Sequence, residues 1–170
     1  MDPILDRFLE KQWEAASALA EESDLLNLVR LDPQRIVAEF RCNGLVLGRD
    51  GRVSASDRTL IGFSFFDNYL RETDPYRVVT WLAPREVWHP NVSFPQLCLG
   101  PINVATPLID LIYRTFELIG YQNVTTNERD ALNPAACQWA RNNQERLPID
   151  ARPLKRRRVQ PCADDIGVTL

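Results

Sequence analysis

The feature that most constrains the fold is a series of β-prone segments joined by turns too short to contain a crossover helix. Segments 26–31 and 35–42 are separated only by Asp32-Pro33-Gln34, which is a typical turn sequence. Successive strands with such short connections favour an antiparallel meander over βαβ units. The chain is therefore expected to build an antiparallel sheet from consecutive strands.

Alternation and turn residues define the other strands. In segment 35–42, every second residue is apolar, which is the period of a half-buried strand. Leu45-Val46-Leu47 leads into Asp50-Gly51, a step that favours a tight hairpin, whereas the polar segment 52–59 supports no assignment. Segments 60–66 and 77–82 complete four principal strands, with a loop between them.

Three helices are predicted from a capping residue followed by proline. Asp2-Pro3 begins an amphipathic helix that ends near Glu22-Ser23, and Thr106-Pro107 begins a second that ends at Gly120. Asn133-Pro134 begins a third helix, in which Cys137 is expected to be a buried packing thiol. One helix, a meander of four strands and two later helices predict an α+β fold.

Length and charge indicate one domain with a basic tail. The chain has 170 residues, of which 45% are hydrophobic, so one core is expected over residues 1–147. From Pro148 the periodicity stops, and prolines and the basic run 155–158 predict a flexible tail over 148–170. Residues 151–170 carry a net charge of +3, which leaves −6 for the rest. This tail either contacts an acidic partner or nucleic acid, or is simply solvated.

The overall composition excludes several classes of partner and site. A net charge of −3 and a pI near 5.2 give no general attraction to nucleic acid or anionic membranes. The first residues have neither the basic start nor the apolar run of a signal peptide, and no apolar stretch approaches the length of a membrane span, so neither is expected. The cysteines form no CxxC pair or cluster with the single histidine, so no metal site is expected. Reduced thiols in the cytoplasm are the expected state.

The loop after the fourth strand carries the residues with chemical potential. It contains the only histidine, His89, followed by Pro90 and Asn91, and Cys98 lies seven positions beyond that asparagine. From the residues alone, a cysteine near a histidine suggests a nucleophile and its base.

Three motifs are similar to those of the ubiquitin-conjugating enzyme (E2) family. Trp88–Val92 resembles the signature before the E2 active site, Leu97-Cys98-Leu99 resembles the thioester cysteine, and Asp130–Ala136 is similar to the acidic loop and helix start that follow. The resemblance implies a UBC-like fold with no cofactor, over an E2-like catalytic domain at residues 1–147.

The chain also departs from the eukaryotic members of that family. The spacing from Asn91 to Cys98 is slightly shorter, no tryptophan follows the cysteine within 99–108, and the proline-rich loop is reduced to Asp74-Pro75. These departures suggest a divergent, bacterial E2-like protein, for which a role in an antiviral defence operon is an expectation.

The resemblance implies a specific acyl transfer. An E1-like activating enzyme would pass the carboxyl terminus of a ubiquitin-like protein to Cys98 as a thioester, and a lysine amine of a protein target would then attack it. Asn91 would hold the loop or stabilise the oxyanion, and Asp130 would orient the lysine or merely begin a helix. His89 would shape the loop, although a role as base remains open.

Two alternatives remain from the sequence. The chain could be a catalytically silent E2-fold module that binds a ubiquitin-like protein as a scaffold, although such modules generally lack the cysteine. It could also be a hydrolase that uses Cys98 and His89.

Overall fold

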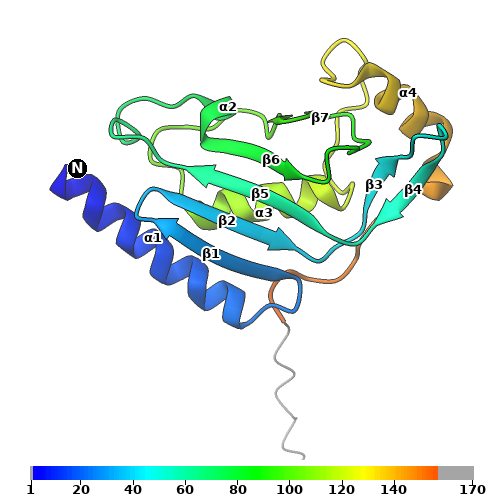
Figure 1. Ribbon diagram of the computed structural model, residues 1–170. Helices are drawn as coiled ribbons and strands as arrows, with labels where there is room; N and C mark the ends of the chain where they lie inside the picture. Colours follow the sequence, from blue (N-terminus) through cyan, green and yellow to red (C-terminus); the bar gives the residue numbers. More distant parts are fainter. Residues whose placement is uncertain (1, 157–170) are drawn as a thin grey trace, which may run out of the picture.

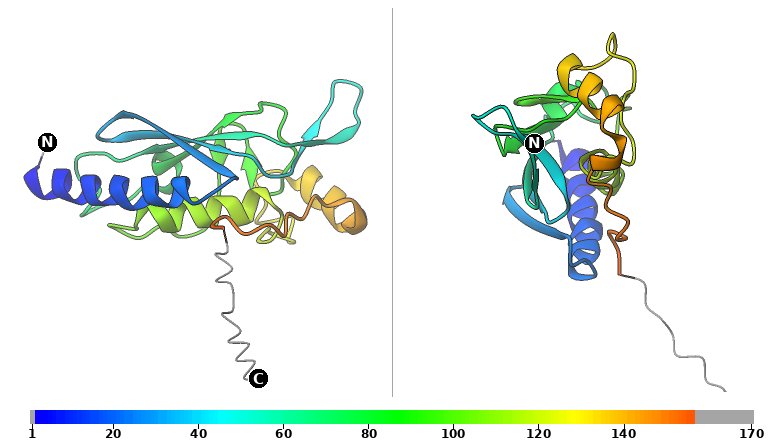
Figure 2. Two further views of the ribbon diagram at one scale, coloured as in Figure 1. Left: turned by 90° about the horizontal axis from the view of Figure 1, so that it is seen from below. Right: turned by 90° about the vertical axis from the view of Figure 1, so that its right-hand side faces the viewer.

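Two helices, α1 and α3, lie against one face of an antiparallel sheet in the computed structural model, which describes residues 2–156 (Figures 1 and 2). The helices are α1 (Pro3–Glu21), α2 (Pro75–Val78), α3 (Leu108–Ile119) and α4 (Pro134–Asn142), with a 3₁₀ turn at Gln144–Arg146. The strands are β1 (Leu26–Asp32), β2 (Arg35–Phe40), β3 (Gly44–Leu47), β4 (Val53–Ser56), β5 (Thr59–Ser64), β6 (Val79–Ala83), β7 (Val92–Ser93) and β8 (Gln96–Leu97). The protein is thus a mixed α+β protein with an N-terminal helix and an antiparallel sheet.

The principal sheet has the order β1-β2-β5-β6-β8-β7, and every pairing in it is antiparallel. The expected four strands are present as β1, β2, β5 and β6. Alternate residues of β2 and β5 are buried beneath the helices, as the period of two predicts: Ile36, Ala38, Phe40, Ile61 and Phe63. The two-residue strands β7 and β8, which the sequence did not predict, extend the sheet into the loop that carries Cys98.

The β3–β4 hairpin, which lies between β2 and β5 in the sequence, forms a separate two-stranded sheet. Its turn contains Gly51 at a φ of 78°, a left-handed conformation that glycine adopts without strain, so the predicted hairpin is confirmed. The segment with no sequence assignment supplies β4. The hairpin also contacts the loop, because Trp88 donates its backbone N–H to Leu45 O at 2.8 Å.

Helix capping follows the sequence at two of the three predicted starts. Asp2 Oδ1 accepts from the N–H of Ile4, and Asn133 Oδ1 accepts from the N–H of Ala136. At α3 the prediction was wrong, because the Thr106 hydroxyl donates to Asn103 O instead of capping the helix. Gln12 of α1 supplies the missing acceptor, since its Oε1 accepts from Leu108 N at 3.0 Å. The cap therefore comes from a distant helix.

The fourth principal strand begins slightly later than the sequence predicts. Arg77 and Val78 belong to the one-turn helix α2, which Asp74 caps through Tyr76 N, and β6 starts at Val79. The proline after Asp74 sets up this turn, which a reading of residues 77–82 as continuous strand overlooked.

Residues 148–156 correct the predicted boundary of the tail. Leu154 is 2% exposed in the main core, and the Asp150 carboxylate is buried and bonded to Arg152. Lys155 and Arg156 pair with Glu22 and Asp24 at the end of α1. A single buried residue, Leu154, gives no periodic pattern in a proline-rich segment. The predicted start of the tail, at residue 148, was therefore too early. The rest of the predicted tail, including the basic residues 157–158 and Cys162, lies outside the described residues.

Over residues 2–156, no helix is both long and apolar enough to cross a membrane.

Candidate functional site

The segment between β6 and α3 is folded back on itself and attached to the sheet edge. β8 pairs with β6 through Thr80 and Gln96, and Trp81 N donates to Pro95 O at 2.9 Å. Cys98 follows β8 directly, and its N–H donates to Asn91 O at 2.9 Å. The loop that carries Cys98 is therefore held at both ends by backbone hydrogen bonds.

His89 is buried, and backbone groups engage both nitrogens of its ring. Its Nε2 lies 2.9 Å from Leu118 O, which requires Nε2 to carry the proton, and its Nδ1 accepts from Asn91 N at 3.0 Å. The ring is 2% exposed and packs against Tyr121, and burial lowers the pKa of the imidazole to about 3. A neutral ring with both nitrogens bonded holds the loop and offers Cys98 no base.

Asn91 connects three backbone segments. Its Oδ1 accepts from Thr125 N at 2.9 Å, and its Nδ2 lies 3.4 Å from Cys98 O, so the amide joins the cysteine to the loop after α3. Pro90 O accepts from Asn133 N at the start of α4. These contacts are those of a residue that holds the loop, and they place the Asn91 Nδ2–H beside the Cys98 backbone.

The loop after α3 is shaped by Tyr121, Gln122 and the start of α4. Tyr121 has a φ of 56°, is buried, and donates its hydroxyl to Trp88 O. Gln122 Nε2 donates to Asp150 O at 2.6 Å, and the Cys137 thiol donates to Thr125 O. Tyr121 and Gln122 therefore hold this loop through contacts with Trp88 and Asp150, whereas the next residue, Asn123, lines the groove beside Cys98.

Cys98 lies half-buried on a groove of about 430 Å³. Side chains from the Cys98 loop, α3 and the loop after α3 line this groove: Asn91, Cys98, Leu99, Gly100, Pro101, Arg114, Leu118, Asn123, Val124, Thr125 and Asp130. Asp130, more than thirty positions from Cys98 in the sequence, thus shares one groove with it. The Asp130 carboxylate accepts from Asn127 Nδ2 at 2.7 Å and is exposed.

Of the four residues singled out from the sequence, the structure brings Cys98, Asn91 and Asp130 together and leaves His89 underneath. Sequence reasoning missed Arg114, which reaches the groove from α3, and Thr125, whose backbone fixes Asn91. Arg114 is the only charged residue within the largely apolar stretch 111–116. A charge at this position was the signal in the sequence that could have identified it.

The other described cysteines are inert by comparison. Cys42 and Cys137 are buried, which confirms the packing role predicted for Cys137. Burial, with the Asp150 charge, raises the pKa of Cys42 to about 12, and burial also raises the pKa of Cys137. Within residues 2–156, no cluster of three or more His, Cys, Asp or Glu side chains could hold a metal ion.

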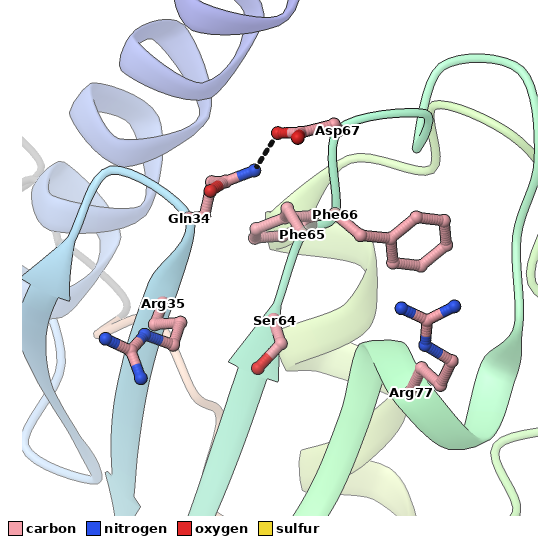
Figure 3. Close-up of a pocket in the computed structure, with 7 residues that line it drawn as sticks. All are labelled: Gln34, Arg35, Ser64, Phe65, Phe66, Asp67 and Arg77. Carbon is pink, nitrogen blue, oxygen red and sulfur yellow. Dashed lines mark hydrogen bonds between the residues drawn. The ribbon is translucent and has the colours of Figure 1, made fainter. Parts of the chain in front are cut away.

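A second hollow, of about 330 Å³, lies where the β1–β2 turn meets the end of β5 and α2 (Figure 3). There, Gln34 Nε2 donates to Asp67 Oδ1, and the Arg77 guanidinium lies 4.7 Å from the centre of the Phe66 ring. Its lining contains neither cysteine nor histidine. The groove beside Cys98 is therefore the stronger candidate for chemistry.

Comparison with known proteins assigns no family. No protein-family model matches this chain. A search of curated proteins also finds no significant relative. A functional proposal must therefore rest on the residues of the groove and their geometry.

The groove presents an accessible thiol, an amide, a carboxylate and a guanidinium on a rigid support. A cysteine of this kind can carry an acyl group, because forming a thioester divides one difficult acyl transfer into two easier steps. With His89 occupied, the described residues contain no second imidazole to activate a water molecule. The arrangement suits acyl transfer to an incoming nucleophile better than autonomous hydrolysis.

Proposed function

We propose that this protein is an E2-like carrier with a divergent UBC-like fold. Cys98 accepts the terminal carboxyl of a ubiquitin-like protein from an E1-like enzyme and transfers it to a lysine amine on a target protein. The observation that carries this proposal is the groove, in which Cys98 meets Asn91 and Asp130 while His89 is buried and fully bonded. The order of helix, meander, loop and two helices further supports the proposal.

The first step loads the carrier. The Cys98 thiolate attacks the thioester carbon on the E1-like enzyme, the new carbon–sulfur bond forms at Cys98, and the E1 thiolate leaves and takes up a proton. The acyl group arrives already activated, so Cys98 needs no imidazole beside it. A carrier thiol must stay reduced, and we propose the cytoplasm as its compartment.

The second step is attack by an amine. Asp130 lies exposed on the groove, where its carboxylate can attract a lysine ammonium and accept its proton as the neutral amine attacks. The tetrahedral intermediate collapses with cleavage of the bond to Cys98 sulfur, which gives an amide and the free thiol. Asn91 holds the Cys98 backbone through both steps, and its Nδ2–H is the amide donor available near the developing oxyanion.

Reconstitution tests this proposal directly. The first step is to search the genes beside this chain for an adenylating enzyme and a small protein with a glycine-ending tail, which would be the partners to use. With ATP, the wild-type protein should form an adduct that thiol reductant removes, Cys98→Ser should form a reductant-stable ester, and Cys98→Ala should form neither.

Two other outcomes would replace the proposal. Binding of the ubiquitin-like protein that Cys98→Ala leaves unchanged, with no adduct under any condition, would indicate a scaffold module. Release of ester or amide products by the protein alone, without an activating enzyme, would indicate a hydrolase. An adduct that persists in Cys98→Ala would exclude Cys98 as the carrier.

A further inference from the structure

The groove contains one cation and one anion that are not paired with each other. Arg114 projects from α3, and its Nη1 donates to Pro101 O at 2.7 Å, whereas Asp130 accepts from Asn127. In the described part of the chain, neither charge forms an ion pair with any side chain. Since a guanidinium has several N–H donors in a planar fork, one bond to a carbonyl leaves others for a ligand.

The position of Arg114 relative to Cys98 sets the part of a ligand that it can contact. Pro101, which holds the guanidinium, is three residues beyond Cys98, so their Cα atoms are at most about 11 Å apart. An extended peptide advances about 3.3 Å per residue. A tail whose terminal carbonyl is bound to Cys98 and which runs along the groove therefore reaches Arg114 within about its last five residues.

We propose that Arg114 selects the ubiquitin-like protein by binding an acidic side chain within about the last five residues of its tail. The inference rests on the proposed function, because it concerns the substrate of the same thiol. A carboxylate matches the guanidinium fork in charge and geometry, while a basic residue there meets a like charge. Among the residues that line the described groove, Arg114 is the only cationic one and Asp130 the only anionic one.

Synthetic peptide thioesters test this selection without an activating enzyme. Glycine-ending peptides carrying mercaptoethanesulfonate as the leaving thiol form a series in which one position, from the second to about the fifth residue from the end, is Glu, Gln or Lys. The Cys98 thiolate forms a thioester with the peptide carbonyl, and mercaptoethanesulfonate leaves as a thiolate that takes up a proton. Initial rates are measured by intact mass spectrometry, with Cys98→Ala subtracting acylation of the other cysteines.

The wild-type protein should load the Glu peptide about fivefold faster than the Lys peptide, near the upper end for a solvent-exposed ion pair. Salt at high concentration should reduce this ratio, because it screens the pair. Arg114→Gln should bring the ratio close to one, Arg114→Glu should invert it, and Arg114→Lys should retain part of it. As a matched control, Arg52→Glu makes the same charge change on the exposed β3–β4 hairpin and should leave the ratio unchanged.

The outcomes separate this inference from the proposed function. Loading of all peptides at Cys98 with no charge preference, or a preference that Arg114→Gln leaves intact, overturns the role of Arg114 and keeps the carrier function. No loading of any peptide above the Cys98→Ala background overturns both.

Discussion

The two regions that contain Cys98 and Cys42 are built from the same residue types and have opposite properties. Each cysteine lies near an aspartate and an arginine. Beside Cys42, the Asp150 carboxylate accepts a hydrogen bond from Arg152 Nε at 2.9 Å, and the Cys42 thiol is fully buried. Around the Cys98 groove, Asp130 and Arg114 stay apart and accessible. Asp150 and Arg152 form an ion pair in the first region, whereas the described residues contain no ion pair of Asp130 or Arg114 in the second.

The contrast in thiol reactivity should be the largest measurable effect. With a pKa of about 12, Cys42 is thiolate in roughly one molecule in 10,000 at pH 8, and burial excludes reagent as well. Iodoacetamide should therefore alkylate Cys98 at least about 1,000-fold faster than Cys42, and also faster than the buried Cys137, in the native protein. Peptide mass spectrometry over time measures the rates, and in denaturant the three should become similar. Comparable native rates would mean that the buried corner opens readily and would remove the contrast.

Exchanging each aspartate for asparagine should separate chemistry from stability. Asp130→Asn should slow attack of lysine on the Cys98 thioester by about 10- to 100-fold, because the amide cannot accept the lysine proton, and leave loading intact. Asp150→Asn should leave both rates of the folded protein within about twofold. Single-turnover discharge of a preloaded thioester gives the rates. Equal discharge by wild type and Asp130→Asn would make Asp130 a helix-start charge only.

For the free energy of unfolding, Asp150→Asn should have a larger effect than Asp130→Asn. Asp150→Asn should lower the free energy of unfolding by about 2 kcal/mol, because it weakens a buried, charge-assisted bond to Arg152. The exposed pair of Asp24 with Arg156 provides a matched control, for which Asp24→Asn should cost less than about 0.5 kcal/mol. Urea titration measures both.

The pH dependence of the Asp150 contribution follows from its pKa. The hydrogen bond from Arg152 holds the pKa of Asp150 below its usual value, so the contribution is present above pH 4, roughly the unfolded value, and is lost as the pH falls below it. The difference between wild type and Asp150→Asn should shrink below that pH. A constant difference would mean that the carboxylate charge is not what stabilises this corner.

A separate pH dependence concerns His89, which is buried and bonded to the backbone through both ring nitrogens. Its pKa is about 3 in the folded protein and near 6.5 in the unfolded chain, so the unfolded state binds the extra proton between these values. Its contribution is complete above pH 6.5 and falls by up to about 1.4 kcal/mol per pH unit below it. His89→Gln should flatten the urea stability profile between pH 4 and 6. A titration near pH 6.5 in the discharge rate of the folded protein would instead give His89 a catalytic role.

Local signals in the sequence predicted much of the fold. The Asp2-Pro3 and Asn133-Pro134 caps, the alternation in β2 and the Asp50-Gly51 turn are each set by residues close together in the chain, and all four are present. The predicted cap of α3 was wrong, because the acceptor is Gln12, about a hundred residues away in the sequence. Similarly, residues 148–156 pack on the protein because Leu154 is buried in the main core, and no local sequence pattern indicates this burial.

In the candidate site too, some features could be predicted from local motifs, whereas others depend on how distant elements pack. Cys98, Asn91 and Asp130 could be named from motifs, and the structure brings them to one groove. The burial of His89 under Tyr121, and the approach of Arg114 from α3, depend on how distant elements pack. Residue types predicted the nucleophile, but only the tertiary arrangement distinguishes a paired charge from one available to a ligand.

The most direct test of the central claim is the fate of a preformed Cys98 thioester when lysine is added. A glycine-ending peptide loaded on Cys98 is mixed with free lysine or with buffer, and mass spectrometry quantifies the peptide–lysine amide and the hydrolysed peptide acid. A carrier predicts that lysine accelerates loss of the thioester and that the amide is the main product. Rapid formation of the acid at a rate independent of lysine would contradict this account and identify a hydrolase.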